Sequence, residues 1–188
     1  EARRVLDILR PFVNRGVPIV GLEPSCLLTL RDEFLAMNLG AEAEELADKA
    51  FMFEEFLVRE KKAGRFSVNL NPLSEKRALL HGHCHQKAFS MMGSVEEVLR
   101  MVPNLEIVVA QGSCCGMAGA FGYNAKNFDT SLAMAEVNLL PAVRSLDANA
   151  VIVADGISCR HQIAYGAERE AMHVARILER ALDEKAVL

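Results

Sequence analysis

The sequence predicts an α/β fold in which parallel strands alternate with helices and helices cover both faces of the sheet. Three observations support this prediction. Four short apolar runs are rich in Leu, Ile and Val and are bounded by Gly, Pro or Asn. Amphipathic segments lie between the runs, and each cysteine follows one of the runs by a few residues.

The four apolar runs predict buried parallel strands. They cover residues 17–22 (VPIVGL), 77–82 (RALLHG), 105–110 (LEIVVA) and 150–155 (AVIVAD). Continuous apolar sequence is typical of strands that are buried on both faces, whereas alternation is typical of strands with one wet face.

The segments between the runs predict helices, because their apolar residues recur with helical spacing. These segments cover residues 1–16, 26–38, 41–64, 94–102 and 127–146. Residues 170–174 predict one more short strand or turn, and residues 175–184 predict a closing helix.

A polar segment over residues 61–76 predicts an internal boundary that divides the chain into halves 1–70 and 71–188. A short internal repeat supports two related halves. Residues 19–26 align with residues 152–159 at one constant offset, and the tripeptide Gly82-His83-Cys84 resembles Gly112-Ser113-Cys114.

Composition excludes several classes of protein. The 188 residues are 51% hydrophobic and carry a formal net charge of -4, so the chain can bury a core and has no basic field for nucleic acid. The apolar runs are too short to cross a bilayer, which predicts no transmembrane segment. We expect a cytoplasmic location, with any membrane association arising through a larger complex. The chain opens into a helical pattern at Glu1 without an initiator Met, so we expect a piece of a longer polypeptide.

The cysteines are the candidate functional residues. Because the carboxyl ends of parallel strands share one edge of a sheet, thiols that follow the strands are expected to converge on one cleft. In a reducing compartment, such thiols predict a soft metal or iron–sulfur cluster, dithiol redox chemistry or covalent catalysis. The adjacent thiols of the pair favour a multi-metal cluster, since consecutive side chains diverge. The candidate metal ligands are Cys26, Cys84, Cys114, Cys115 and Cys159.

Glycines and basic residues surround these cysteines. The glycines of the segment GSCCGMAG, Gly112 and Gly116 among them, would let the backbone approach a metal centre and donate amide N–H groups to its sulfurs. Basic side chains would favour thiolates and an anionic centre or substrate, and any of the three histidines among them could instead be a ligand. They are His83, His85, Lys87, Arg160 and His161.

Four further residues have simpler predicted roles. Glu23 and Asp155 lie at strand ends, where they could orient those histidines. His81 is expected to be structural, and His173 is expected to support a helix start. The motifs G-x-G-x-x-G and G-x-x-x-x-G-K-[ST] are both missing, so nucleotide binding ranks low.

The segments EPSC, HGHCHQKA, GSCCGMAG and DGISCRHQI together resemble the cysteine-rich CCG domain. This domain occurs in heterodisulfide reductase, in glycolate oxidase iron–sulfur subunits and in FAD-linked 2-hydroxyacid dehydrogenases. The resemblance covers nearly the whole chain and is strongest to the C-terminal part of long fused proteins. It implies a pair of Rossmann-like, three-layer α/β halves with the metal site between them.

The resemblance also implies ligands and partners. The family's thiol ligands fall on Cys84, Cys114, Cys115 and Cys159, and Cys26 is contributed by a degenerate first half. The family motif ends in Cys-x-x-Cys, whereas Gln162 stands here at the last position, and only one CCG element is present instead of two. A cubane [4Fe-4S] centre, a non-cubane form and a simpler metal site therefore remain open. FAD is expected only on an upstream domain, next to a ferredoxin-like domain, with a quinone or another carrier as electron acceptor.

Two functional classes follow. In the first, the chain is an electron-transfer module with an iron–sulfur centre, part of a flavin-dependent dehydrogenase of 2-hydroxyacids such as D-lactate, glycolate or 2-hydroxyglutarate, and it is not catalytic on its own. In the second, the thiols act as a dithiol–disulfide couple or hold zinc. A docking domain that has lost its metal is a third, non-catalytic interpretation.

Overall fold

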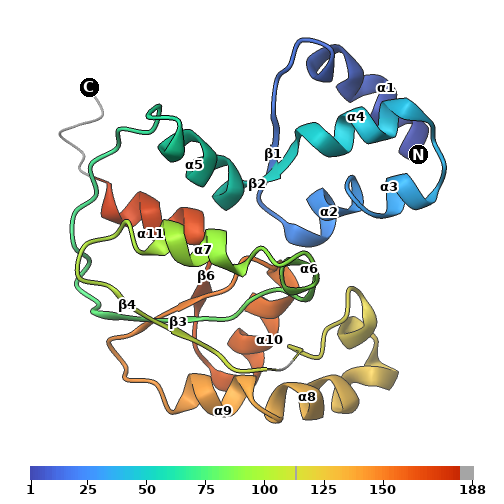
Figure 1. Cartoon of the computed structure of the whole chain (residues 1–188). Coiled ribbons are helices and arrows are strands. Elements are labelled where there is room, and N and C mark those ends of the chain that lie inside the picture. Colours follow the sequence, from blue (N-terminus) through green and yellow to red (C-terminus); the bar gives the residue numbers. More distant parts are fainter. Residues whose placement is uncertain (113, 183–188) are drawn as a thin grey trace.

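The computed structural model describes residues 1–112 and 114–182. It shows an α/β fold with parallel strands in two separate sheets (Figure 1). The first sheet has two strands in the order β1-β2, and the second has four strands in the order β4-β3-β5-β6. The predicted α/β class with parallel strands is confirmed.

The strands are short. They are β1 (Ile19–Gly21), β2 (Ala50–Met52), β3 (Arg77–Leu80), β4 (Glu106–Val109), β5 (Val151–Val153) and β6 (Ala171–Met172). Each of the four predicted apolar runs contains one strand, and the short strand expected within residues 170–174 is β6. The Leu, Ile and Val side chains of these runs suit a surface that helices cover on both sides.

Three of the predicted helices divide, and residues 84–88 and 157–167 form helices that were not predicted. The prediction of one helix over residues 26–38 is wrong, because the chain leaves the helical conformation at Asp32, which has φ -124° and ψ -76°. The observed helices otherwise follow the predicted pattern. They are α1 (Ala2–Val13), α2 (Pro24–Thr29), α3 (Glu33–Ala36), α4 (Ala41–Lys49), α5 (Phe53–Lys62), α6 (Cys84–Ala88), α7 (Met92–Leu99), α8 (Phe128–Glu136), α9 (Leu139–Arg144), α10 (Ile157–Ala167) and α11 (Val174–Ala181), with 3-10 turns η1 (Phe121–Tyr123) and η2 (Ala125–Asn127). The last two residues of the predicted closing helix, 183 and 184, lie outside the described residues.

The prediction of one helix over residues 41–64 is wrong, because β2 interrupts it. Ala50 leaves the helix with φ -86° and ψ 120°, and residues 50–52 pair in parallel with β1. Ala50 and Met52 are buried while Phe51 between them is partly exposed. Three residues are too few to disturb a helical apolar pattern, so the periodicity did not reveal the strand.

The helical pattern over residues 127–146 also divides, into α8 and α9. Pro141 is the third residue of α9. A proline is tolerated in the first turn of a helix, but its ring clashes with the carbonyl four residues earlier in a helix interior. The chain therefore ends one helix before Pro141 and starts another, with Asn138 at φ -145° between them.

The four-stranded sheet is the middle layer of three (Figure 1). Leu80 and Val153 face one core, which α5, α7 and α11 cover. Leu79 and Ile152, which alternate with them, face a second core that α9 and α10 cover. Burial of both faces, which the continuous apolar runs predicted, is confirmed for β3 and β5. It is wrong for β1 and β4, whose residues are exposed or partly exposed because each strand lies at the edge of its sheet.

Residues 2–52 form a smaller unit around the two-stranded sheet, with a separate core that includes Leu28, Leu46 and Met52. In α5, however, Leu57 and Val58 pack into the core of the large sheet. The apolar packing therefore passes from one core to the other near residue 53. The division into halves 1–70 and 71–188 and the internal repeat stay predictions, although both repeat segments contain a strand followed by a helix, β1 with α2 and β5 with α10.

No described helix combines the length and the apolar character that a membrane span needs.

The large core predicts the first stability change. Leu80 is 0% exposed in the central strand β3, so Leu80→Ala should lower the free energy of unfolding by about 2–5 kcal/mol through lost burial and a residual cavity. Urea unfolding followed by circular dichroism measures this. Val137→Ala is the control, because Val137 is 67% exposed and its truncation should change stability by less than about 0.5 kcal/mol. Equal effects of the two variants would contradict the described packing.

Candidate metal centre

Four cysteines follow strands of the large sheet. Cys84 is the first residue of α6, directly beyond β3. Cys114 and Cys115 lie in the loop beyond β4, and Cys159 is the third residue of α10, beyond β5. Because β4, β3 and β5 are parallel neighbours, the three loops emerge along one edge.

The four thiols form two close pairs. The Sγ atoms of Cys84 and Cys114 lie 3.7 Å apart, and those of Cys115 and Cys159 lie 3.3 Å apart. Adjacent cysteines in the chain thus turn toward different partners. Cys84 is exposed and Cys159 is buried, so the set extends from the surface into the second core.

Three of the four thiols, those of Cys84, Cys114 and Cys115, line a pocket of about 240 Å³. The thiol of Cys159 lies behind the lining, where it is paired with Cys115. The residues that line the pocket come from four loops and are Ser25, His83, Cys84, His85, Cys114, Cys115, Ala118, Gly119 and Ser158. Cys26 is not among the lining residues, and its thiol is exposed, although its neighbour Ser25 contributes. The structure therefore brings together four of the five candidate cysteines.

The two buried thiols differ in their affinity for a proton. A hydrogen bond from the Cys159 thiol, assisted by the imidazole of His81, lowers the pKa of Cys115 to about 4. The same hydrogen bond, together with burial, raises the pKa of Cys159. Burial, followed by the charge of Cys114, raises the pKa of Cys84 to about 11. The hydrogen bond therefore favours the thiolate on Cys115 and the thiol on Cys159.

His81 is a site residue that the sequence reasoning assigned to structure alone. It is buried, and one ring nitrogen and the Sγ atoms of Cys115 and Cys159 all lie within 4.8 Å of one another. Its Nε2 has no hydrogen-bond partner among the described residues. The signal in the sequence was its position directly after β3, where the other candidate residues also follow strands.

His83 and His85 line the pocket beside Cys84. His83 caps α6, since its Nδ1 accepts a hydrogen bond of 3.2 Å from the backbone N–H of His85. Burial lowers the pKa of His83, with the charge of Glu23 acting in the opposite direction. A neutral imidazole is the form that can bind a metal.

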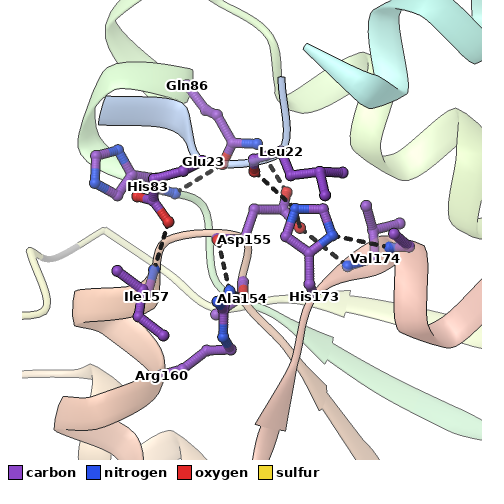
Figure 2. Close-up of polar contacts among 11 residues, drawn as sticks. Leu22, Glu23, His83, Gln86, Ala154, Asp155, Ile157, Arg160, His173 and Val174 are labelled. Carbon is purple, nitrogen blue, oxygen red and sulfur yellow. Dashed lines mark hydrogen bonds and ion pairs between the residues drawn. The ribbon is translucent and has the colours of Figure 1, made fainter. Parts of the chain in front are cut away.

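Arg160 and His161 lie beside Cys159 in sequence but bond elsewhere. Nη1 of Arg160 donates to the backbone carbonyls of Ala154 and Asp155, and Nδ1 of His161 lies 2.8 Å from the hydroxyl of Tyr123. Their predicted influence on the thiols stays a prediction. The structure places Arg160 as a brace for the loop after β5 (Figure 2).

Glu23 and Asp155 do not bond to the histidines they were expected to orient. Glu23 accepts hydrogen bonds from the hydroxyl of Ser25 and from the backbone N–H of Ile157, the first residue of α10 (Figure 2). Asp155 accepts from Gln86 and from the backbone N–H of Val174. His173, in contrast, does support a helix start, since its Nδ1 accepts from the backbone N–H of Ala175 in α11.

The backbone conformation of the loop after β4 itself requires two of its glycines. Gly116 has φ +85°, and a Cβ atom there would lie 2.0 Å from the carbonyl oxygen of Ser131 in α8. Its backbone N–H lies 3.3 Å from Sγ of Cys114, as expected for an amide that donates to a sulfur ligand. Gly112 has φ +75°, and an added Cβ there would make only an ordinary contact of 3.7 Å with Nδ2 of Asn138, so only its backbone conformation requires glycine.

Comparisons with known proteins point to dehydrogenases. The chain is 28% identical over 170 residues to a component of the anaerobic glycerol-3-phosphate dehydrogenase of Escherichia coli K12; the match covers 89% of this chain and 41% of that protein. It is 31% identical over 167 residues to D-2-hydroxyglutarate dehydrogenase of the same strain, covering 86% of this chain and 15% of that protein. The corresponding enzyme of Pseudomonas putida is 29% identical over 173 residues, covering 90% of this chain and 16% of that protein.

The chain therefore spans less than half the length of each of these relatives. No family model matches the chain, and no solved structure matches it.

Gly116 provides a test of the loop. Gly116→Ala should lower the free energy of unfolding by more than about 1 kcal/mol, because the residue needs a positive φ and close contact with α8. Gly93→Ala, in α7 with nothing within 4 Å of the added Cβ, should be neutral or stabilise by up to about 1 kcal/mol. Chemical unfolding of both variants measures the contrast, and a stable Gly116→Ala variant would contradict this loop conformation.

Proposed function

We propose that this chain is an electron-transfer module that binds an iron–sulfur centre through Cys84, Cys114, Cys115 and Cys159. The observation that carries the proposal is the convergence of these four thiols in pairs 3.7 Å and 3.3 Å apart, with three of them lining one pocket and Cys159 bonded to Cys115 behind it. Thiolate sulfur is the ligand that iron–sulfur clusters use, and four such ligands are the usual number.

The surroundings of the thiols fit such a centre. The N–H of Gly116 donates to Cys114, and hydrogen bonds of this kind tune the potential of a cluster. The neighbouring Cys114 and Cys115 point to separate partner thiols, which suits several metal atoms better than one ion. When bound, an iron–sulfur centre supplies one-electron transfer, and this chain's residues fix its burial and its hydrogen bonds.

The relatives support a role within a dehydrogenase. One is a component of a multi-subunit dehydrogenase and another is a dehydrogenase of a 2-hydroxyacid, and the chain matches only 41% and 15% of their lengths. We infer that the chain works with flavin and ferredoxin-like parts, in the same polypeptide or in other subunits, and passes electrons to a quinone or another carrier.

Zinc is the second candidate, favoured by one observation. His81, Cys115 and Cys159 present one nitrogen and two sulfur atoms within 4.8 Å of one another, and zinc accepts this ligand set. The two close thiol pairs would equally support a dithiol–disulfide couple.

Metal analysis after anaerobic purification and reconstitution decides between these functions. The native protein should be brown and should contain iron and acid-labile sulfide. Cys115→Ser should lose most of both, because it removes one of the four sulfur ligands, the one that lines the pocket and pairs with Cys159. The variant should still give a folded far-ultraviolet circular dichroism spectrum.

Cys26→Ser is the matched control, because the thiol of Cys26 is exposed and belongs to neither of the two close thiol pairs among the described residues. It should keep the iron and sulfide content of the native protein. A colourless protein with one tightly bound zinc, or equal iron loss in both variants, would contradict the proposal.

A further inference from the structure

Asp155 is a buried carboxylate that joins α6 and α11 through Gln86 and Val174 (Figure 2). It is 1% exposed and lies between β5 and α10. Its Oδ2 accepts a hydrogen bond of 2.8 Å from Nε2 of Gln86, and its Oδ1 accepts one of 3.0 Å from the backbone N–H of Val174. Both oxygens are therefore used as acceptors.

Gln86 uses its other amide atom as well. Its Oε1 accepts a hydrogen bond of 3.1 Å from the backbone N–H of His83, and its side chain is 1% exposed. With a backbone donor on one side and a carboxylate on the other, the amide has only one orientation that satisfies both partners. Gln86 thus connects the start of α6, next to Cys84, with Asp155.

Asp155 also adjoins the other cysteine-bearing helix, since α10 begins two residues later at Ile157. The next residue, Gly156, is so close to Cys159 that an added Cβ would lie 3.3 Å from its Sγ and 2.5 Å from the His83 ring. The segment that Asp155 anchors therefore contacts both cysteine-bearing helix starts.

We propose that Gln86 and Asp155 are positioning residues, which hold the start of α6 with Cys84 and the start of α10 with Cys159 at the separation the metal centre needs. This inference rests on the proposed function, because it concerns the spacing of the ligands named there. Partners that orient metal ligands are commonly worth 10- to 100-fold in metal affinity.

A second metal at Asp155 is the competing interpretation, since Glu54, Asp155 and His173 also present ligand atoms within 4.8 Å. The hydrogen bonds of His173 disfavour it. Its Nδ1 accepts from the backbone N–H of Ala175, so the ring proton is on Nε2, which lies 2.8 Å from the carbonyl oxygen of Leu22. Neither ring nitrogen has a free lone pair for a metal.

A proton on Glu54, and not a metal ion, neutralises one of the two carboxyl groups in the cluster of Glu54, Asp155 and His173. Glu54 is 1% exposed, and neither carboxyl oxygen has a hydrogen-bond partner among the described residues. Burial, followed by the charge of Asp155, raises the pKa of Glu54 to about 9. The other charged or titratable groups beside it are His173 and Glu55, and Glu55 is paired with Arg31 at 2.8 Å. Glu54 is thus a neutral acid at neutral pH.

Exchanging the amide of residue 86 and the carboxylate of residue 155 tests whether the hydrogen bond between these side chains positions the two helix starts. In Asp155→Asn, the amide offers one acceptor to two donors, Gln86 and Val174, so one N–H loses its partner in any orientation. Gln86→Glu alone places two carboxylates face to face. The double variant Gln86→Glu/Asp155→Asn restores every bond, because Glu accepts from the His83 N–H and from the new Asn amide.

We expect each single variant to bind iron at least about 10-fold more weakly in chelator competition, and the double variant to recover native affinity. The electron paramagnetic resonance spectrum of the reduced protein should change in the single variants and return in the double variant. Native iron affinity in Asp155→Asn, or a double variant as weak as the single ones, would overturn the inference.

A metal-free measurement separates this inference from the proposed function. Hydrogen exchange at the amides of His83 and Val174, followed by NMR, should be slow in the native protein, faster at one of them in Asp155→Asn and slow again in the double variant. If the native protein binds no iron, the proposed function fails, while this exchange pattern still decides whether the link exists.

Glu54→Gln tests whether Glu54 stays protonated in the folded protein. Between the unfolded pKa near 4.5 and about 9, native Glu54 keeps a proton that the unfolded chain releases, so the folding equilibrium constant should fall by up to about tenfold per pH unit as pH rises. Glu54→Gln removes this loss while keeping shape and neutrality, and it should leave iron affinity unchanged. Stability profiles that run parallel in native and variant protein from pH 5 to 9 would show that Glu54 holds no proton.

Discussion

The parallel pairing of β3 with β4 on one side and β5 on the other is the constraint on which the candidate site depends. Leu80 at the end of β3 is in register with Val109 of β4 and Val153 of β5, so three loops begin at the same level of the sheet. Cysteines that are 30 and 44 residues apart in the chain meet there as neighbouring pairs. The sheet fixes the distance between the starts of the loops, so each loop has to bring its thiol only a short distance further to meet its partner.

Polar groups buried near this edge keep those loops in place. An unpaired buried polar atom is costly, so each hydrogen bond there excludes alternative loop positions. Gln86 and Asp155 connect the loops after β3 and β5, Arg160 braces the second of these, and Gly116 sets the third against α8. The thiols are thus positioned from behind by groups that do not line the pocket.

The sequence was sufficient for the sheet and for the collection of thiols, because strand burial and strand ends leave local patterns. Each apolar run contained a strand, and four of the five candidate cysteines came together as two close pairs. The sequence was insufficient where long-range contacts decide. β2 forms because β1 lies beside it, and its three residues alone fit a helix equally well. His81 has an ordinary local pattern, and only its approach to Cys115 and Cys159 sets it apart. Asp155 was noticed at its strand end, but its partners are 69 and 19 residues away and cannot be identified from spacing.

Glu23 accepts a hydrogen bond from the first N–H of α10, which lies 134 residues further along the chain. That helix has no side-chain cap from its own N-cap residue, Gly156. The unit formed by residues 2–52 therefore caps α10, a helix that packs against the four-stranded sheet. A fragment trimmed to the large sheet would retain every paired thiol yet begin the Cys159 helix with an exposed, uncapped turn. A fragment that contains only the four-stranded sheet and its helices would thus lack the carboxylate that caps the helix of Cys159.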